Sequence, residues 1–241
     1  MAVLKNHTRN LKTVQINIKP FFVLKVLLLF ILLLSGLHLL GLYLGAGVSP
    51  RFMVQFDFNQ EANIPAFFSA INLFLCALLL LLTSLLKQKS GSPMLSWAFL
   101  GLIFLFLSVD EAAGIHEMIM GMTRRALNLS GYFYYAWIVP YGLGVVLLTA
   151  LLVPFFKDLP KRTRSLFLTS GAIFLTGSVG FEMLGGNIIQ SQGPTALYSF
   201  YYTCEEMLEM IGSSLFIYAL LDHITGIYGS SISIGRSDGS L

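Results

Sequence analysis

The chain has 241 residues, of which 56% are hydrophobic and only 11% are charged, and its net charge is +3. A soluble domain carries about 25% charged residues, so this composition excludes a water-soluble enzyme. The basic residues form no clustered stripe, which argues against nucleic acid as a partner. One lipid-embedded bundle of helices would use nearly the whole length, leaving no room for a second folded domain.

Six apolar stretches are long enough to cross a bilayer as helices of about 20 residues or more. They cover residues 20–45, 64–86, 94–118, 132–156, 165–186 and 198–224. Each must be helical, because lipid offers no partners to the open edge of a strand. The predicted fold is therefore all-α. Its parts in chain order are a basic tail over residues 1–19, a six-helix membrane domain over 20–225 and a flexible tail over 226–241.

The distribution of lysine and arginine predicts the orientation of these helices. Twelve of the fifteen basic residues fall on the side of the two chain ends, and the three exceptions are Arg51, Arg124 and Arg125. Both termini are therefore expected in the cytoplasm. This pattern predicts a multi-pass protein of the bacterial cytoplasmic (inner) membrane, with membrane lipid as its surroundings and partner.

Acidic residues inside the predicted spans are the main indication of function. A charge at the centre of a bilayer costs about 3 kcal/mol or more, and no lysine or arginine lies at a comparable depth. Such groups persist only if they protonate, share protons or hold a cation. Seven of the twelve acidic residues are of this kind: Asp110, Glu111, Glu117, Glu182, Glu205, Glu206 and Glu209.

Several of these acids are expected at one depth. At about 1.5 Å per residue, Asp110, Glu111 and Glu205 lie about 10–12 Å below the outer ends of their helices. His38 of the first span is expected at the same level, and Glu182 of the fifth span nearer the surface. Because these residues come from four spans, we expect them to converge in the outer leaflet.

The third span raises a problem of helical phase. Asp110 and Glu117 share one face of a continuous helix, whereas Glu111 and His116 diverge from that face on either side. An unbroken helix cannot aim all four at one point. Either Gly114 bends the helix, or one pair serves the site and the other pair serves packing.

Carboxylates from several helices, together with one or two histidines, are how helical bundles hold metal ions. A carboxylate-rich set with few histidines suits a divalent ion such as Fe, Mn, Mg or Ca better than Zn, and gives no reason to expect Cu(I). Two alternatives stay open: a cluster that titrates without metal, and a structural set of neutral acids. The candidate metal ligands are His38, Asp110, Glu111, His116, Glu117, Glu182, Glu205 and Glu209.

Three stretches, at residues 56–65, 107–117 and 205–210, together resemble a widespread group of uncharacterised bacterial polytopic membrane proteins. The similarity extends over residues 40–225 and implies membership of that group, which has no assigned activity. Intramembrane zinc hydrolases of the alkaline ceramidase type need a three-histidine site with His-x3-His, and that spacing is absent from this sequence.

The site predicts a metal-dependent enzyme acting on a lipid-like or amphipathic substrate, with the metal as Lewis acid or redox centre. One alternative is a proton- or cation-coupled transporter in which the same acids titrate. Another is an accessory subunit of a larger membrane complex, with a protein partner or further copies of the chain. No internal repeat of the transporter type is present.

Overall fold

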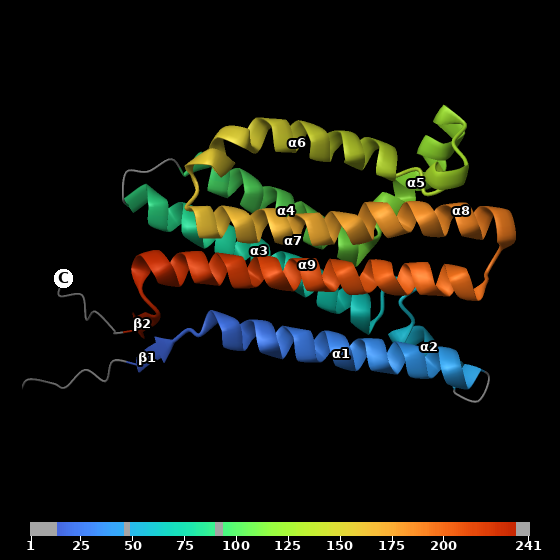
Figure 1. The fold of residues 1–241 in the computed structure, drawn as a ribbon, viewed down its shortest axis with the longest axis horizontal. Helices are drawn as coiled ribbons and strands as arrows, with labels where there is room; N and C mark the ends of the chain where they lie inside the picture. Colours follow the sequence, from blue (N-terminus) through green and yellow to red (C-terminus); the bar gives the residue numbers. More distant parts are fainter. Residues whose placement is uncertain (1–13, 46–48, 90–93, 235–241) are drawn as a thin grey trace, which may run out of the picture.

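The computed structural model describes residues 14–45, 49–89 and 94–234, most of which are helical (Figure 1). The helices are α1 (Pro20–Leu44), α2 (Pro50–Phe56), α3 (Ile64–Lys89), α4 (Leu95–Ala113), α5 (Ile115–Leu127), α6 (Ile138–Asp158), α7 (Lys161–Leu175), α8 (Glu182–Gln192) and α9 (Ala196–Tyr228). A 3-10 turn, η2 (Gly131–Phe133), precedes α6, and a π-helical turn, η3 (Thr176–Phe181), joins α7 to α8. Two short strands, β1 (Val14–Asn17) and β2 (Ser231–Ile234), complete the described part.

Six helical segments in the described ranges are long and apolar enough to cross a membrane, which confirms the predicted multi-pass helical protein. Five of them are the single helices α1, α3, α4, α6 and α9. The sixth runs from Lys161 to Gln192 through α7, η3 and α8. The cytoplasmic placement of the termini remains a prediction.

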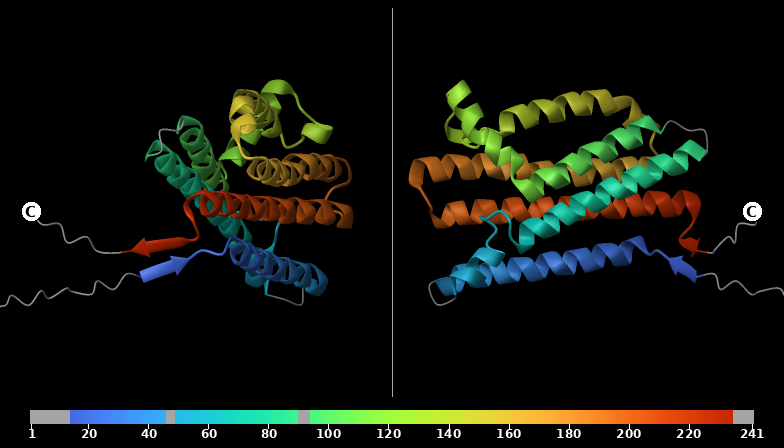
Figure 2. Two further views of the ribbon diagram at one scale, coloured as in Figure 1. Left: turned by 60° about the vertical axis from the view of Figure 1, so that its left-hand side comes forward. Right: turned by 180° about the vertical axis from the view of Figure 1, so that it is seen from behind.

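Helix α9 is the centre of the bundle. In the most apolar stretch of 18 residues in α9, 61% of the stretch is buried, against 11% in the corresponding stretch of α6. α9 packs on α1, α3 and α7 (Figures 1 and 2). One apolar cluster gathers around Leu80, Trp97 and Phe216, and a second around Ile31 and Met210. The core of the protein therefore lies along α9, whereas α6 runs along the edge of the bundle.

The two ends of the bundle differ. Helices α2 and α5 and the last turn of α8 lie at one end, and the two strands lie at the other (Figure 1). We call the end with α2 and α5 the distal end. The acidic residues of α4 and α9 belong to the distal halves of their helices, because α4 ends and α9 begins at that end.

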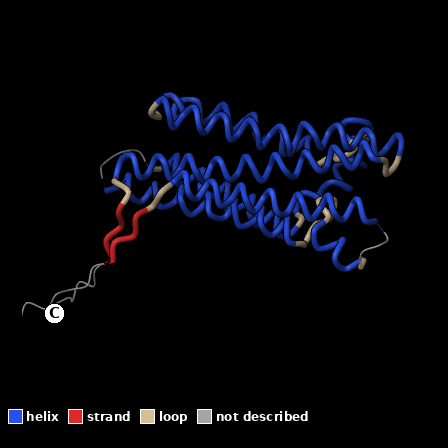
Figure 3. Tube along the Cα trace, turned by 60° about the horizontal axis from the view of Figure 1, so that its bottom comes forward, coloured by secondary structure: helices blue, strands red, loops and turns tan. Residues whose placement is uncertain are grey.

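Parts of both predicted tails are ordered. Strand β1 pairs antiparallel with β2, with Val14 opposite Ile234 (Figure 3). Helix α9 also continues to Tyr228, past the predicted boundary at residue 225. The predicted tails 1–19 and 226–241 thus contribute a two-stranded sheet and a last helical turn. The parts at 1–13 and 235–241 lie outside the described residues.

The third predicted span, 94–118, is wrong at its distal end, because it comprises two helices. α4 ends at Ala113, and Gly114 has a left-handed backbone with φ 60° that most residues with a side chain avoid. α5 begins at Ile115 and runs in a new direction (Figure 2). Of the two alternatives for this span, the bend at Gly114 is therefore confirmed.

Two glycines allow the fifth and sixth spans to touch backbone to backbone. A Cβ placed on Gly212 would lie 2.7 Å from the backbone nitrogen of Phe174. A Cβ on Gly177 would lie 2.7 Å from the carbonyl oxygen of Glu205. Real Cβ atoms do not approach backbone so closely, so glycine is needed at both positions. This contact fixes the distance between the helices that carry Glu182 and Glu205.

Candidate functional site

A cavity of about 330 Å³ lies among α4, α6, α7 and α9 and reaches the distal end. Sites for small-molecule ligands typically measure about 300–1,000 Å³, so this volume is large enough for a ligand. Carboxylates and tyrosines line its distal part, and mainly aliphatic and aromatic side chains, with a few hydroxyl groups such as those of Thr149 and Ser170, line the rest. The cavity is thus polar at one end and apolar along most of its length.

The cavity brings together most of the predicted ligand residues. Two further carboxylates, Glu61 and Glu206, also line it. Sequence reasoning leaves Glu206 out of the ligand set although it shares the sixth span with its neighbours. It misses Glu61, which lies in the loop between α2 and α3 and whose only signal is its place in the stretch 56–65. The seven predicted residues that line the cavity are Asp110, Glu111, His116, Glu117, Glu182, Glu205 and Glu209.

Asp110 and His116 form the joint between α4 and α5. The carboxylate oxygen Oδ1 of Asp110 accepts a hydrogen bond of 2.7 Å from the backbone N–H of His116. The same oxygen lies 3.4 Å from the Nδ1 atom of the His116 ring. Asp110 therefore binds an unpaired N–H in the first turn of α5 as well as the imidazole, which fixes the bend at Gly114. The structure gives this pair a positioning role.

Glu182 and Glu205 face each other from the two helices that touch at the glycines. Their carboxyl groups are within hydrogen-bonding reach of each other. The indole N–H of Trp137 donates a hydrogen bond of 2.9 Å to Oε1 of Glu182. Two carboxyl groups can meet this closely only with a proton shared between them or a cation beside them. Trp137 fixes the position of one member of the pair.

The turn η3 sets the direction of Glu182. In this π-helical turn the backbone hydrogen bonds span five residues instead of four, which changes the helical phase of the residues that follow. Glu182 is the first residue after the turn and begins α8. The hydroxyl of Ser178, within the turn, donates a hydrogen bond of 3.1 Å to the carbonyl oxygen of Phe174. Glu182 therefore reaches the cavity through an irregular turn inside an otherwise continuous span.

The cavity contains one cationic partner for its acids. No lysine or arginine is found among the described residues that line it. Burial lowers the pKa of His116, but the hydrogen bond and charge of Asp110, with the charges of Glu182 and Glu111, outweigh burial and raise that pKa to about 9. Burial raises the pKa of Glu61, against the opposing charge of His116. One imidazolium cannot balance this number of carboxylates.

One face of α6 forms a wall of the cavity. Tyr141, Val145, Leu148 and Leu152 line it at spacings of three and four residues, the period of one helical face. The opposite side of α6 is exposed, for example Val146 at 65%. In a bilayer that exposed side would meet lipid. α6 therefore separates the cavity from the membrane.

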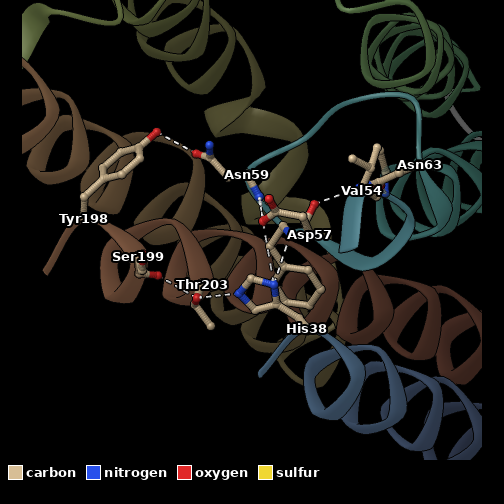
Figure 4. A network of polar contacts seen from close by, with 10 residues as sticks. His38, Val54, Asp57, Asn59, Asn63, Tyr198, Ser199 and Thr203 are labelled. Carbon is tan, nitrogen blue, oxygen red and sulfur yellow. Dashed lines mark hydrogen bonds and ion pairs between the residues drawn. The ribbon is translucent and has the colours of Figure 1, made fainter. Parts of the chain in front are cut away.

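The structure places His38 outside the cavity, in a network of its own (Figure 4). The ring atom Nε2 lies 3.0 Å from Oγ1 of Thr203, which donates in turn to the carbonyl oxygen of Ser199 at 2.6 Å. The backbone N–H of Phe58 donates to Nδ1 at 3.3 Å. Oδ1 of Asp57 lies 3.8 Å from the same nitrogen. These contacts fit a neutral ring with its proton on Nε2, and both nitrogens are occupied.

His38 holds the loop that covers the distal end of the cavity. Its ring stacks flat on Phe58, with centroids 4.4 Å apart and an interplanar angle of 4°. Phe58 and Asn59 line the cavity, and Oδ1 of Asn59 accepts a hydrogen bond of 2.6 Å from the hydroxyl of Tyr198 (Figure 4). That hydroxyl also lies 2.9 Å from the hydroxyl of Tyr135. The loop is thus fixed to α1 and to α9.

The carboxylates of the described part of the chain are not arranged as a preformed metal-binding site. Among the described residues, no group of three or more histidine, cysteine, aspartate and glutamate side chains is arranged to hold a metal ion. Cys76 and Cys204 are free thiols. A cation would therefore need some of the cavity's carboxylates to rotate toward it.

Comparisons with known proteins agree with the expectation that the chain belongs to an uncharacterised family. A family model described as a domain of unknown function (DUF8692) matches residues 23–224. The matched range includes all of the described residues that line the cavity. No curated protein and no solved structure matches the chain.

Proposed function

The chain belongs to this family of unknown function, and we propose that it binds an amphipathic, lipid-like molecule within the membrane. The polar end of that molecule would meet a divalent cation held by the carboxylates of the cavity. The observation that carries the proposal is the two-part lining of one cavity, acidic at the distal end and apolar along α6. A lipid-like molecule has the same two parts in the same order.

The apolar part of the cavity supports an apolar chain as its occupant. Its walls come from three helices and include Phe104 of α4, Leu148 of α6, and Phe167 and Phe174 of α7. Water in such a place would lack partners, so an apolar occupant is favoured. The wall formed by α6 is the least buried of the spans and borders the membrane, where such molecules are found.

The acidic part supports a cation. Glu205, Glu206 and Glu209 lie within two turns of α9 and line the cavity together with Glu182 of α8. Oxygen ligands of this kind are preferred by Mg²⁺, Ca²⁺ and Mn²⁺. Because Asp110 and His116 are engaged at the helix joint, the proposed ligands are the four carboxylates of α8 and α9. A cation there would polarise an oxygen atom at the polar end of the bound molecule.

Transport of an ion across the membrane fits the cavity less well. A conducting path needs polar groups along its length, because a charge in an apolar medium is costly. Toward the end with the strands, the described lining is mainly apolar, with side chains such as Leu152, Phe156 and Phe167, and holds no charged group. Binding at one depth is therefore favoured over passage from side to side.

A cavity-filling variant tests the apolar part. Gly142 lines the cavity, and a Cβ at this position meets nothing within 4 Å, so Gly142→Leu would place a side chain in the empty volume. Gly144→Leu is the matched control, because Gly144 has the same free space but is exposed and lies outside the lining. Mass spectrometry of gently purified protein should find a bound lipid-like molecule in wild type and Gly144→Leu and none in Gly142→Leu.

The same preparations test the acidic part by elemental analysis and by melting with and without a chelator. Glu205→Gln and Glu209→Gln keep the shape of the side chain but remove the charge, so both should carry less metal than wild type. Asp158→Asn, which changes an exposed acid at the end of α6, should behave like wild type. The bound cation would be contradicted if wild type contained no metal and its melting temperature did not change with chelator. Gln variants of equal or greater stability would then favour neutral acids.

A further inference from the structure

A second cavity, of about 360 Å³, lies beside the first at the distal end. The start of α3 and the loop before it form one side, and the last turn of α4 forms the other. Glu111 is the only described residue that lines both cavities. Its carboxylate is half-buried and stands on the wall between them. We call the second cavity the vestibule.

The vestibule has a built frame. The side-chain N–H groups of Asn63 donate to the carbonyl oxygen of Val54 at 3.2 Å and to that of Asp57 at 2.7 Å (Figure 4). Its Oδ1 atom accepts a hydrogen bond of 3.1 Å from the backbone N–H of Ala66. One buried amide thus joins α2, the loop and the first turn of α3. These bonds hold the side of the vestibule that faces Glu111 in place.

The lining of the vestibule differs from that of the first cavity's apolar part. Three of its eight described lining residues are polar, and because backbone groups engage the amide of Asn63, Gln55 and Glu111 are the two whose polar groups can meet an occupant. A hydrated cation loses much of its hydration energy in an apolar passage, and polar side chains replace part of that loss. The vestibule therefore offers a hydrated cation the side chains of Gln55 and Glu111, whereas the wall along α6 suits an apolar chain.

We propose that the vestibule is the route by which water and hydrated cations reach the carboxylates of α8 and α9, with Glu111 at its inner end. This inference rests on the proposed function for the identity of the site that is reached. It assigns to Glu111 a role apart from the four proposed ligands: the carboxylate attracts the cation at the wall and passes it inward. The polar reactant and the lipid-like molecule then arrive by separate routes.

Accessibility to two carbodiimides tests the route without needing bound metal or lipid. Ala112→Cys places a thiol in the vestibule, in a chain whose own Cys76 and Cys204 are replaced by alanine. A bulky sulfonated maleimide on this thiol should block the vestibule. In chelator-treated protein, labelling of Glu205 by a water-soluble carbodiimide should then be lost. Labelling by apolar dicyclohexylcarbodiimide, read by peptide mass spectrometry, should persist.

Two further variants keep the result interpretable. Ser191→Cys, an exposed position on α8 outside both cavities, is the matched control and should leave both labels unchanged after maleimide treatment. Phe67→Cys offers a second thiol in the vestibule, since Phe67 is 65% exposed. Unchanged water-soluble labelling in the blocked protein would overturn the proposal, and so would loss of both labels. Neither result bears on whether metal or lipid co-purifies with wild type.

Discussion

Single hydrogen bonds at two places decide how the site is assembled. At the joint of α4 and α5, one carboxylate oxygen of Asp110 serves both the backbone and the ring of His116. Behind the loop at the distal end, His38 connects Thr203 of α9 to the backbone of Phe58. Each of these polar groups is partly or fully buried, so losing its partner costs more than the bond itself contributes.

The pairing at the joint predicts a dependence of stability on pH. The pKa of His116 is raised from 6.5 to about 9 in the folded protein, so its protonated form stabilises the fold. This contribution is fully present below pH 6.5 and is lost as the pH rises through about 9. Asp110→Asn should therefore lower the melting temperature strongly in the acidic range and much less above pH 9.

The control for this measurement is Asp158→Asn, which removes an exposed acid at the far end of α6. Its effect on the melting temperature should not follow the titration of His116. A difference between wild type and Asp110→Asn that stays constant through the whole pH range would contradict the pairing.

The His38 network predicts a cost for removing one hydroxyl. Thr203→Val keeps the volume of the side chain but leaves the buried Nε2 of His38 without a partner, which should cost about 1–3 kcal/mol of unfolding free energy. Thr225→Val is a matched control on the same helix, because the Thr225 hydroxyl bonds only to the backbone of its own helix. Denaturation in detergent measures both, and equal losses would show that Thr203 does not support the ring.

Among the elements, the contact between the fifth and sixth spans determines where the acids stand. Gly212→Ala would drive a methyl group into the backbone of Phe174, and overpacking of this kind costs about 1–3 kcal/mol. Gly171→Ala, on the facing helix α7, meets nothing within 4 Å and should instead stabilise by about 0.5–1 kcal/mol through helix propensity. Thermal unfolding of the two variants provides the measurement, and a stable Gly212→Ala protein would contradict the close contact.

The positions of the spans follow from the sequence, because the need to hydrogen-bond every backbone group in lipid leaves helices as the only solution. The convergence of acids from the third, fifth and sixth spans follows from depth alone, and their common cavity agrees with it. The fate of His38 does not follow, because its depth matches the acids while its direction depends on Thr203 and on the loop at Phe58. Counting residues along a helix predicts the depth of a side chain in the membrane but not the direction in which it points.

Two irregular turns explain what else escapes sequence reasoning. Gly114 is visible as a candidate bend, and the left-handed backbone there is a normal role for glycine. The π-turn at Thr176–Phe181 has no comparable signal, and it rotates Glu182 relative to the face that an α-helical count assigns. Glu61 escapes because the loop that carries it folds back over the cavity.

At the scale of the whole molecule, the protein divides into a packed part and a loose part. α9 holds α1, α3 and α7 together around two apolar clusters. α6 runs along the outer side of this part (Figure 2). Residues of α6 and of the packed part line the cavity together. The proposed binding site thus lies at the border of a densely packed part and a loosely packed helix, where a long, flexible occupant could enter without unfolding the core.

The length of α6 connects this site to the thickness of the bilayer. Its 21 residues extend over about 31 Å, close to the roughly 30 Å of a hydrocarbon core, whereas the 33 residues of α9 extend over about 50 Å. A thinner bilayer tilts such a helix and a thicker one draws it upright. Because α6 is one wall of the cavity and is the least buried span, we expect a change in its tilt to change the width of the cavity. We therefore expect hydrophobic mismatch in the surrounding membrane to change the volume of the cavity, and with it the binding of the proposed occupant.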